Sequence, residues 1–204
     1  MESAEKRRFC QRALAGAGAV LAAGAGVSAL ARHRKPVEEQ DPAASYFTNA
    51  RLTTHEGRQV RFYDDLLKGK MVVINMMYTT CSGICPANTA SILSVRRALE
   101  KHVDKAIHFY SLSLRPEMDD ARALAQYRER YGISGDWTFL TGDPAEVDLI
   151  RRRLGFYDSD PVRDRDLNSH TGVLRVGKVP LERWCMVPAA ASTDQIVATI
   201  LGVA

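Results

Sequence analysis

The chain has 204 residues and a formal net charge of +4, with 46% apolar and 25% charged residues. This composition is typical of a globular protein and excludes disordered and collagen-like chains. The positive charge belongs to the first 35 residues, which hold seven Lys and Arg against two Glu, so that residues 36–204 sum to −1. A near-neutral body lacks the basic surface of nucleic-acid-binding proteins, and we therefore expect no nucleic-acid partner.

The first 31 residues have the pattern of an export signal. Residues 13–31 carry no charge and are rich in Ala and Gly, and basic residues precede them. Residues 29–31 (Ala-Leu-Ala) offer a small-residue cleavage site, and residues 6–9 (Lys-Arg-Arg-Phe) resemble the core of a twin-arginine signal. The stretch 13–31 is also just long enough for a membrane anchor, so residues 1–31 are either a cleaved signal peptide or a retained anchor. In both alternatives a twin-arginine-like or Sec signal directs export. Residues 32–204 are then expected in the periplasm or at the outer face of a bacterial inner membrane.

Residues 32–45 separate this segment from the rest of the chain. They contain two prolines, six charges and no hydrophobic periodicity, which predicts a linker. The folded domain is then expected over residues 46–204. A chain of about 160 residues buries roughly two-thirds of the surface that it exposes when unfolded, so its core needs no metal or disulfide.

A short hairpin is predicted at the start of this domain. Strand patterns at Leu52–Thr54 and Gln59–Tyr63 flank a tight turn in which Gly57 takes a positive φ. His55 in this turn is interpreted as a solvated residue.

Strand and helix patterns alternate after the hairpin. Met71–Tyr78 is a nearly continuous apolar run, which is typical of a central strand buried on both faces. Further strands are predicted at Ile107–Leu114 and Trp137–Thr141. Helices are predicted after the cysteine loop at 79–86, over Met118–Tyr131, over Pro144–Arg153 and after Ser192. A late hairpin is predicted from strands at Thr171–Val176 and Leu181–Val187, joined by a turn at Gly177-Lys178. The polar run between Gly155 and Ser169 is interpreted as an exposed, solvated loop. This order predicts an α/β sandwich around a central mixed sheet, of the thioredoxin-like kind, with an extra N-terminal hairpin.

Cys81 and Cys85 stand in the loop between the central strand and the next helix. Their spacing is too long for an unstrained disulfide within a regular helix, but with Gly83 in a loop the pair can form a disulfide or bind a metal through two sulfurs. The start of a helix lowers the pKa of a nearby thiol, and the thiolate is both a nucleophile and a soft metal ligand. A structural disulfide is the simplest alternative in an oxidising compartment, although closing so short a loop adds little stability.

Two thiolates rarely complete a metal site, and the five His of the chain offer a third ligand. His33 falls in the predicted linker, His102 at a helix end and His108 in a strand, where each has an ordinary structural role. His170 instead stands where a loop enters the late hairpin, and in thioredoxin-like folds that entry approaches the cysteine loop. Two Cys and one His suit Cu(I), the imidazole lets the site hold Cu(II) as well, and Zn(II) is possible by ligand type.

Residues 78–86 (Tyr-Thr-Thr-Cys-Ser-Gly-Ile-Cys-Pro) after a buried strand, together with His170 and the Thr that follows it, resemble the Sco/SenC family of copper chaperones. Members of that family are membrane-tethered or exported thioredoxin-like proteins that deliver copper to, or reduce the cysteines of, the dinuclear copper site of cytochrome c oxidase. The resemblance spans residues 46–204. It implies that Cys81, Cys85 and His170 bind copper, as Cu(I) or Cu(II), and that the two cysteines form a redox pair. It also implies, as partner, the copper-bearing subunit of cytochrome c oxidase or another periplasmic copper or thiol protein.

Two positions depart from the family pattern. Ser169 precedes the His where an acidic residue is common, which alters the hydrogen bonding expected around His170. Arg115 stands where an Asp is usual in the turn after the second strand, and we expect this cation to lower the thiol pKa values further and to favour redox chemistry.

Three cysteines remain once the predicted signal, which holds Cys10, is removed, and Cys185 is the one outside the pair. If Gly177-Lys178 is a two-residue turn, Cys185 pairs with His170 across the late hairpin and shares its face of the sheet. One hypothesis makes Cys185 a fourth soft ligand or a resolving thiol. The alternative makes it a small buried apolar residue beside Trp184.

The sequence therefore leaves two functions open. One is a copper-binding chaperone, which transfers metal by ligand exchange and need not be an enzyme. The other is a thiol-disulfide oxidoreductase, in which Cys81 attacks a partner disulfide and Cys85 resolves the mixed disulfide. A peroxidase fits less well, because the second Cys and the isolated His-Thr are foreign to that chemistry.

Overall fold

The computed structural model describes residues 41–100, 106–167 and 172–204. The predicted signal or anchor at 1–31, His102 and His170 lie outside these described residues. Within them, no helix has both the length and the apolar character that crossing a bilayer requires.

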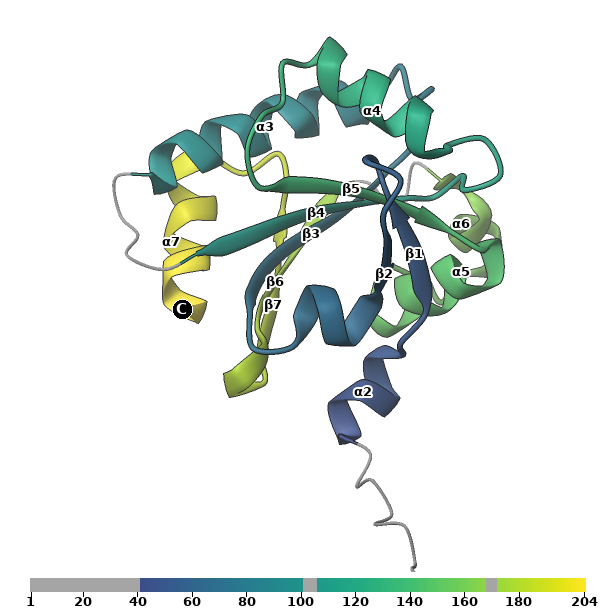
Figure 1. The fold of residues 1–204 in the computed structure, drawn as a ribbon. Helices are drawn as coiled ribbons and strands as arrows, with labels where there is room; N and C mark the ends of the chain where they lie inside the picture. The colour runs from purple at the N-terminus through teal and green to yellow at the C-terminus, as the bar shows by residue number, and fades with distance from the viewer. Residues whose placement is uncertain (1–40, 101–105, 168–171) are drawn as a thin grey trace, which may run out of the picture. The chain divides into compact units, whose positions relative to one another are not determined.

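A seven-stranded mixed sheet organises the described residues (Figure 1). Its strands are β1 (Arg51–Thr54), β2 (Gln59–Arg61), β3 (Met71–Met77), β4 (Ile107–Ser113), β5 (Trp137–Gly142), β6 (Val173–Lys178) and β7 (Arg183–Pro188). They lie in the order β2-β1-β5-β4-β3-β6-β7, in which β3, β4 and β5 are parallel and the other pairs antiparallel. Every residue of β3 is buried, which confirms the prediction of an interior strand.

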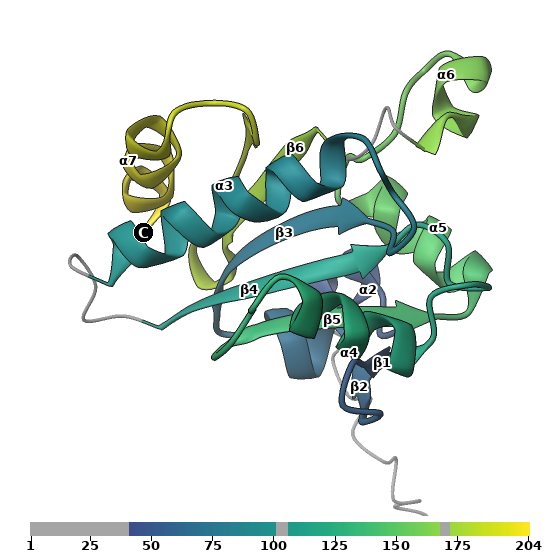
Figure 2. The same cartoon turned by 90° about the horizontal axis from the view of Figure 1, so that it is seen from above.

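Helices cover both faces of this sheet (Figures 1 and 2). They are α2 (Pro42–Phe47), the π-helical segment η2 (Phe62–Leu67), α3 (Ile84–Leu99), α4 (Ala121–Arg130), α5 (Pro144–Arg153), α6 (Pro161–Arg165), the 3-10 turn η4 (Val179–Leu181) and α7 (Thr193–Val203). One core cluster joins α3, α4 and α7 to one face, and a second joins α2, η2 and α5 to the other. Because side chains alternate along a strand, Val73 of β3 lies in the first cluster and Val72 in the second.

The helix starts follow the predicted capping residues. The Asp143 side chain accepts from the N–H groups of Ala145 and Glu146 ahead of α5. Ser192 forms a capping box with Gln195 ahead of α7, which satisfies two N–H groups that would otherwise lack a partner. These boundaries were predictable because the cap and the first helical turn are local in sequence.

The N-terminal hairpin is confirmed, with Gly57 at φ +81°, but its surroundings differ from the predictions. The second strand ends at Arg61 because η2 begins at Phe62. Helix α2 begins at Pro42, inside the range predicted as a linker, and the Tyr63 hydroxyl donates to the Asp41 side chain that caps it, at 2.7 Å.

His55 is not the solvated turn residue that was predicted. Its side chain is 8% exposed. Its Nδ1 lies 3.3 Å from the Phe139 nitrogen, which donates to it, and its Nε2 contacts the Arg128 guanidinium. Burial, followed by the charge of Arg128, lowers the pKa of His55, so a neutral imidazole fastens this turn to β5 and α4.

The late hairpin has a longer connection than predicted. The turn consists of η4 and Glu182, whose φ is +52°, and not of Gly177-Lys178. This connection shifts the register, so that Cys185 lies opposite Val176. The predicted pairing of Cys185 with His170 is therefore wrong.

The polar run between Gly155 and Ser169 is not a fully solvated loop. It contains α6, and its Asp164 accepts hydrogen bonds from Arg151 at 2.8 and 3.0 Å. Arg151 is only 6% exposed and also donates to the Phe156 carbonyl oxygen at 2.7 Å. The hydrogen bond from Arg151 holds the pKa of Asp164 well below its usual range, so this ion pair anchors α6 against α5.

Gly177 is required by close packing between β6 and β7. It lies opposite Trp184, whose ring occupies the space that a β-carbon at Gly177 would fill. The ring is held from other sides by Phe47, at 5.0 Å between centroids, and by the Arg175 guanidinium at 5.5 Å.

We predict that Gly177→Ala lowers the free energy of unfolding by about 1–3 kcal/mol, because the added methyl group displaces the Trp184 ring. Urea denaturation of the two proteins measures this difference. Gly202→Ala in α7 is the matched control, since no atom lies within 4 Å of the added carbon. The control should keep or slightly raise stability, and equal stability of the two variants would contradict the packing argument.

Candidate functional site

The cysteine loop connects the end of β3 to the start of α3. Cys81 follows Met77 by four residues, and its N–H donates to the Tyr78 carbonyl oxygen at 3.2 Å. Gly83 is the N-cap of α3, which places Cys85 in the first helical turn. Both thiols thus lie at the carboxyl edge of the parallel strands, where α/β proteins commonly place their sites.

The two cysteines are free thiols and are almost entirely buried. Cys81 is 6% exposed and Cys85 is 2% exposed, and both belong to the core cluster under α3. The Cys85 thiol donates a hydrogen bond to the Cys81 sulfur. The pair is therefore already assembled while both residues are reduced.

The surroundings of the two sulfurs differ in a way that divides their roles. Burial opposes ionisation of Cys81, but hydrogen bonds from the Cys85 side chain, from the N–H groups of Cys85 and Gly83 and from the Tyr78 hydroxyl outweigh it. The pKa of Cys81 is consequently lower than that of an ordinary thiol. Burial and the adjacent Cys81 sulfur raise the pKa of Cys85, and the charge of Asp119 adds to this effect. The pair therefore favours one thiolate, at Cys81, next to one thiol.

Asp119 is the support beneath this loop and was not identified from the sequence, where it was assigned to a helix start. Its side chain is fully buried and accepts hydrogen bonds from the Thr79 N–H at 3.0 Å and the Thr79 hydroxyl at 2.5 Å. The Ser113 hydroxyl at the end of β4 donates to it at 2.5 Å. The local signal was weak because the donors lie 40 and 6 residues away.

Arg115 was expected to lower the thiol pKa values, but it is not among the main groups that shift the pKa of Cys81 or Cys85. Its guanidinium lies 5.9 Å from the centroid of the Tyr78 ring, and the hydroxyl of that ring bonds to Cys81. The hydrogen bonds to Cys81, and not the charge of Arg115, account for the low pKa of the thiol.

A third metal ligand is not found among residues 41–100, 106–167 and 172–204, where no three His, Cys, Asp or Glu side chains cluster. His170 lies outside the described residues, so its role stays a prediction. Gly172, two positions later, lies beside the loop, because a β-carbon there would be 3.6 Å from Ile84 Cδ1.

The observed strand register does not bring Cys185 next to Cys81 and Cys85. Val176, its cross-strand partner, is opposite Val73 of β3, four residues before the end of that strand. This offset corresponds to about 13 Å along the sheet. Burial raises the pKa of Cys185, which fits the alternative of a small, partly buried apolar residue next to Trp184.

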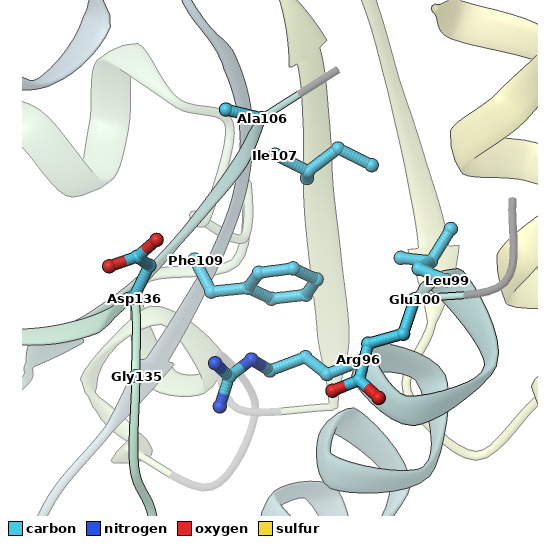
Figure 3. A pocket seen from close by; sticks show the side chains of 8 residues that line it. All are labelled: Arg96, Leu99, Glu100, Ala106, Ile107, Phe109, Gly135 and Asp136. Atoms are coloured by element: carbon cyan, nitrogen blue, oxygen red, sulfur yellow. The ribbon is translucent and has the colours of Figure 1, made fainter. Parts of the chain in front are cut away.

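A cavity with a volume of about 320 Å³ lies at the C-terminal end of α3, away from the cysteine loop (Figure 3). The Arg96 guanidinium extends into it, 5.6 Å from the centroid of the Phe109 ring, and donates to the Ser134 carbonyl oxygen. Arg96 follows Cys85 by about three helical turns, or roughly 16 Å. This cavity is therefore separate from the cysteine site.

Comparisons with known proteins agree with this geometry. The family model described as SCO1/SenC matches residues 38–200. A curated relative, the SCO1 protein homolog of Bacillus subtilis (strain 168), is 33% identical over 78 residues, which cover 37% of this chain and 39% of the relative. The match thus spans well under two-thirds of that protein.

Two solved structures show the same fold. Copper-bound ScoI of Bradyrhizobium japonicum has a TM-score of 0.58 at 24% identity and is covered over 76% of this chain and 97% of its own. BsSco, described as having a disulfide switch and as a member of the Sco family of cytochrome c oxidase assembly proteins, has a TM-score of 0.61 at 20% identity, covering 75% and 90%. The predicted thioredoxin-like sandwich is confirmed.

We predict that Cys81 is alkylated at lower pH than Cys85 in the reduced, copper-free chain. Mass spectrometry of iodoacetamide-treated peptides across a pH series measures the midpoint for each thiol. Tyr78→Phe should raise the midpoint of Cys81, because the thiolate loses a hydrogen-bond donor, whereas the exposed Tyr46→Phe control should not. A lower midpoint for Cys85 would contradict the assignment.

A second prediction concerns the support under the loop. Asp119→Ala leaves the buried Ser113 hydroxyl and two partly buried donors of Thr79 without their acceptor, and should cost about 3 kcal/mol or more of unfolding free energy. It should also lower the pKa of Cys85 by removing a nearby negative charge. Urea denaturation and the alkylation series test both effects, with the exposed Glu117→Ala as control. A variant as stable as the control would show that Asp119 does not hold the loop.

Proposed function

The chain belongs to the SCO1/SenC family, and on that premise we propose that it binds copper and delivers it to, or reduces the cysteines of, the dinuclear copper site of cytochrome c oxidase. Copper is the cargo in this proposal. The ligands are the sulfurs of Cys81 and Cys85 and the imidazole of His170.

The observation that carries the proposal is the reduced, buried thiol pair at the start of α3. Thiolates are the ligands that Cu(I) prefers, and Cys81 is held by hydrogen bonds that favour its thiolate. Binding of a cation removes the reason for Cys85 to keep its proton, because the Cys81 charge that opposed ionisation is neutralised. The pair therefore supplies two soft donors without rearranging the fold.

The position of Gly172 supports His170 as the third ligand. Gly172 lies beside Ile84 in the first turn of α3. Consecutive Cα atoms are about 3.8 Å apart, so the Cα of a residue two positions earlier is at most about 7.6 Å from that of Gly172. An imidazole at position 170 is thus within reach of the cysteine loop.

The partner and the location follow from the family and the N-terminal segment. Copper-bound ScoI and the assembly protein BsSco are relatives in fold, and this supports a copper-bearing subunit of cytochrome c oxidase, or another periplasmic copper or thiol protein, as partner. An export signal or anchor at residues 1–31, with a membrane contact through residues 13–31, would place the domain on that side of the membrane.

The side-chain hydrogen bond between Cys85 and Cys81, which favours a thiolate at Cys81, supports thiol-disulfide exchange as a second function. The Cys81 thiolate would attack a disulfide of the partner, form a mixed disulfide and release one partner thiolate. The Cys85 thiol would then lose its proton and attack the Cys81 sulfur, which releases the second partner thiolate and leaves a Cys81–Cys85 disulfide. The partner gains the two electrons that the pair loses.

Copper titration of the reduced full-length chain tests the proposal. We expect tight Cu(I) binding in competition with a chromophoric chelator, and Cu(II) binding with a thiolate charge-transfer band. Copper binding should be weakened more than about tenfold by each of Cys81→Ser, Cys85→Ser and His170→Ala. Loss of a residue that merely hydrogen-bonds to a metal ligand already lowers metal affinity by about tenfold, so loss of a ligand should cost more.

Cys185→Ser and His108→Ala are the matched controls and should bind copper as the unaltered chain does. Binding that is weak and indifferent to His170→Ala, together with reduction of a partner disulfide that requires Cys81, would reject the chaperone in favour of the oxidoreductase.

A further inference from the structure

A second cavity, with a volume of about 500 Å³, lies on the face of the sheet opposite the cysteine pair. Tyr110 and Leu66, two of its lining residues, belong to the core cluster of α2, η2 and α5, whereas Cys81 and Cys85 belong to the other cluster. Its walls come from the β1–β2 hairpin, η2, the residue before β3 and the first halves of β4 and β5.

Tyr110 brings an unpartnered polar group to this cavity. Its side chain is 4% exposed and belongs to the core cluster of α2, η2 and α5. Its hydroxyl makes no hydrogen bond with any residue in the described ranges, yet it is not sealed from solvent. The hydroxyl therefore meets the open space that Tyr110 lines, and a ligand there would be its hydrogen-bond partner.

Lys70 brings a positive charge whose hydrogen-bond positions are only partly used. It is half-buried, and its ammonium donates to the Asp65 carbonyl oxygen. The Asp65 carboxylate is engaged by Arg61, through the backbone N–H at 2.7 Å and the guanidinium at 3.1 Å. Burial lowers the pKa of Lys70 more than the charge of Asp65 raises it. No ion pair within 4 Å joins Lys70 to a described residue, so its ammonium keeps two hydrogen-bond positions free for a ligand.

Two further groups complete the donor set. The His108 ring stacks on Tyr110 with 6.3 Å between centroids, and Thr138 lies opposite Tyr110 on β5. Neither side chain has a hydrogen-bond partner among the described residues. Of the acids that line the cavity, the Asp65 carboxylate is engaged by Arg61. Asp136, exposed just before β5, is close enough for its charge to act on Tyr110 and His108.

We propose that this cavity binds a small oxyanion, a carboxylate or a phosphate, through the Lys70 ammonium and the Tyr110 hydroxyl, with His108 and Thr138 as further donors. The donors of Lys70, Tyr110, His108 and Thr138 that lack a protein acceptor favour an anion, because each gains a partner that water supplies less well in a partly buried site. The site uses none of the proposed copper ligands and stands whether or not the chain carries copper.

Isothermal titration of the copper-free, full-length chain at constant pH and ionic strength tests the proposal, with inorganic phosphate as one probe and sodium acetate as the other. Binding of either probe identifies the class of anion. Tyr110→Phe keeps the packed ring and removes only the hydroxyl, and Thr138→Val does the same for the facing residue. Lys70→Met removes the charge.

Tyr110→Phe and Lys70→Met should each lower the affinity for the anion that binds by about tenfold or more, as expected for the loss of a hydrogen bond to a charged group. Lys68→Met is the matched control, because it removes an exposed lysine two residues away that does not line the cavity, and it should leave binding unchanged. Absence of binding by both probes would overturn the proposal. Equal binding by Tyr110→Phe, Lys70→Met and Lys68→Met, with all three folded by circular dichroism, would overturn it as well.

Discussion

The site depends on one buried carboxylate. The cysteine loop leaves the sheet at the end of β3 and runs through partly exposed residues, yet it must hold the buried Cys81 at a fixed position before α3 begins. Asp119 resolves this by accepting from the N–H and the hydroxyl of Thr79, while Ser113 ties the same carboxylate to the end of β4. A charged acceptor is strong enough to fix Thr79 two residues before Cys81, so the position of the sulfur is set from outside the loop.

The same carboxylate takes part in the division of labour between the sulfurs. A negative charge near two thiols disfavours a second thiolate, and Asp119 is among the groups that raise the pKa of Cys85. Cys81 receives donors from Gly83, Cys85 and Tyr78 and is therefore the sulfur that holds the charge. One thiolate beside one thiol suits two kinds of chemistry. A metal ion can displace the remaining proton, and a partner disulfide can be attacked by the thiolate and released by the thiol.

The sequence predictions were right where the interactions join residues close together in the chain and wrong where they join distant segments. The apolar run of β3, the Asp143 cap and the turn at Gly57 are decided within a few residues, and all were predicted. The fold class and the cysteine pair also followed from local patterns. Asp119, the burial of His55 and the Arg151–Asp164 pair depend on contacts between distant segments, so polar residues that looked solvated in the sequence are buried in the fold. The prediction of a two-residue turn at Gly177-Lys178 in the late hairpin was wrong, because η4 lengthens the connection between the two strands. The third ligand, His170, stays a prediction.

Strand β4 connects the two faces of the molecule without coupling them. Alternation directs Phe109, Ser111 and Ser113 toward the side of the cysteine pair, where the Ser111 hydroxyl donates to Asn75 at 2.6 Å and accepts from Trp137 at 2.9 Å. The intervening His108 and Tyr110 face the cavity on the reverse side. The polar groups on the two sides share no hydrogen-bond partner among the described residues, and substitutions that share no partner are additive. A loss of anion binding through Tyr110 should therefore leave copper binding intact, which separates a second ligand site from a general loosening of the sheet.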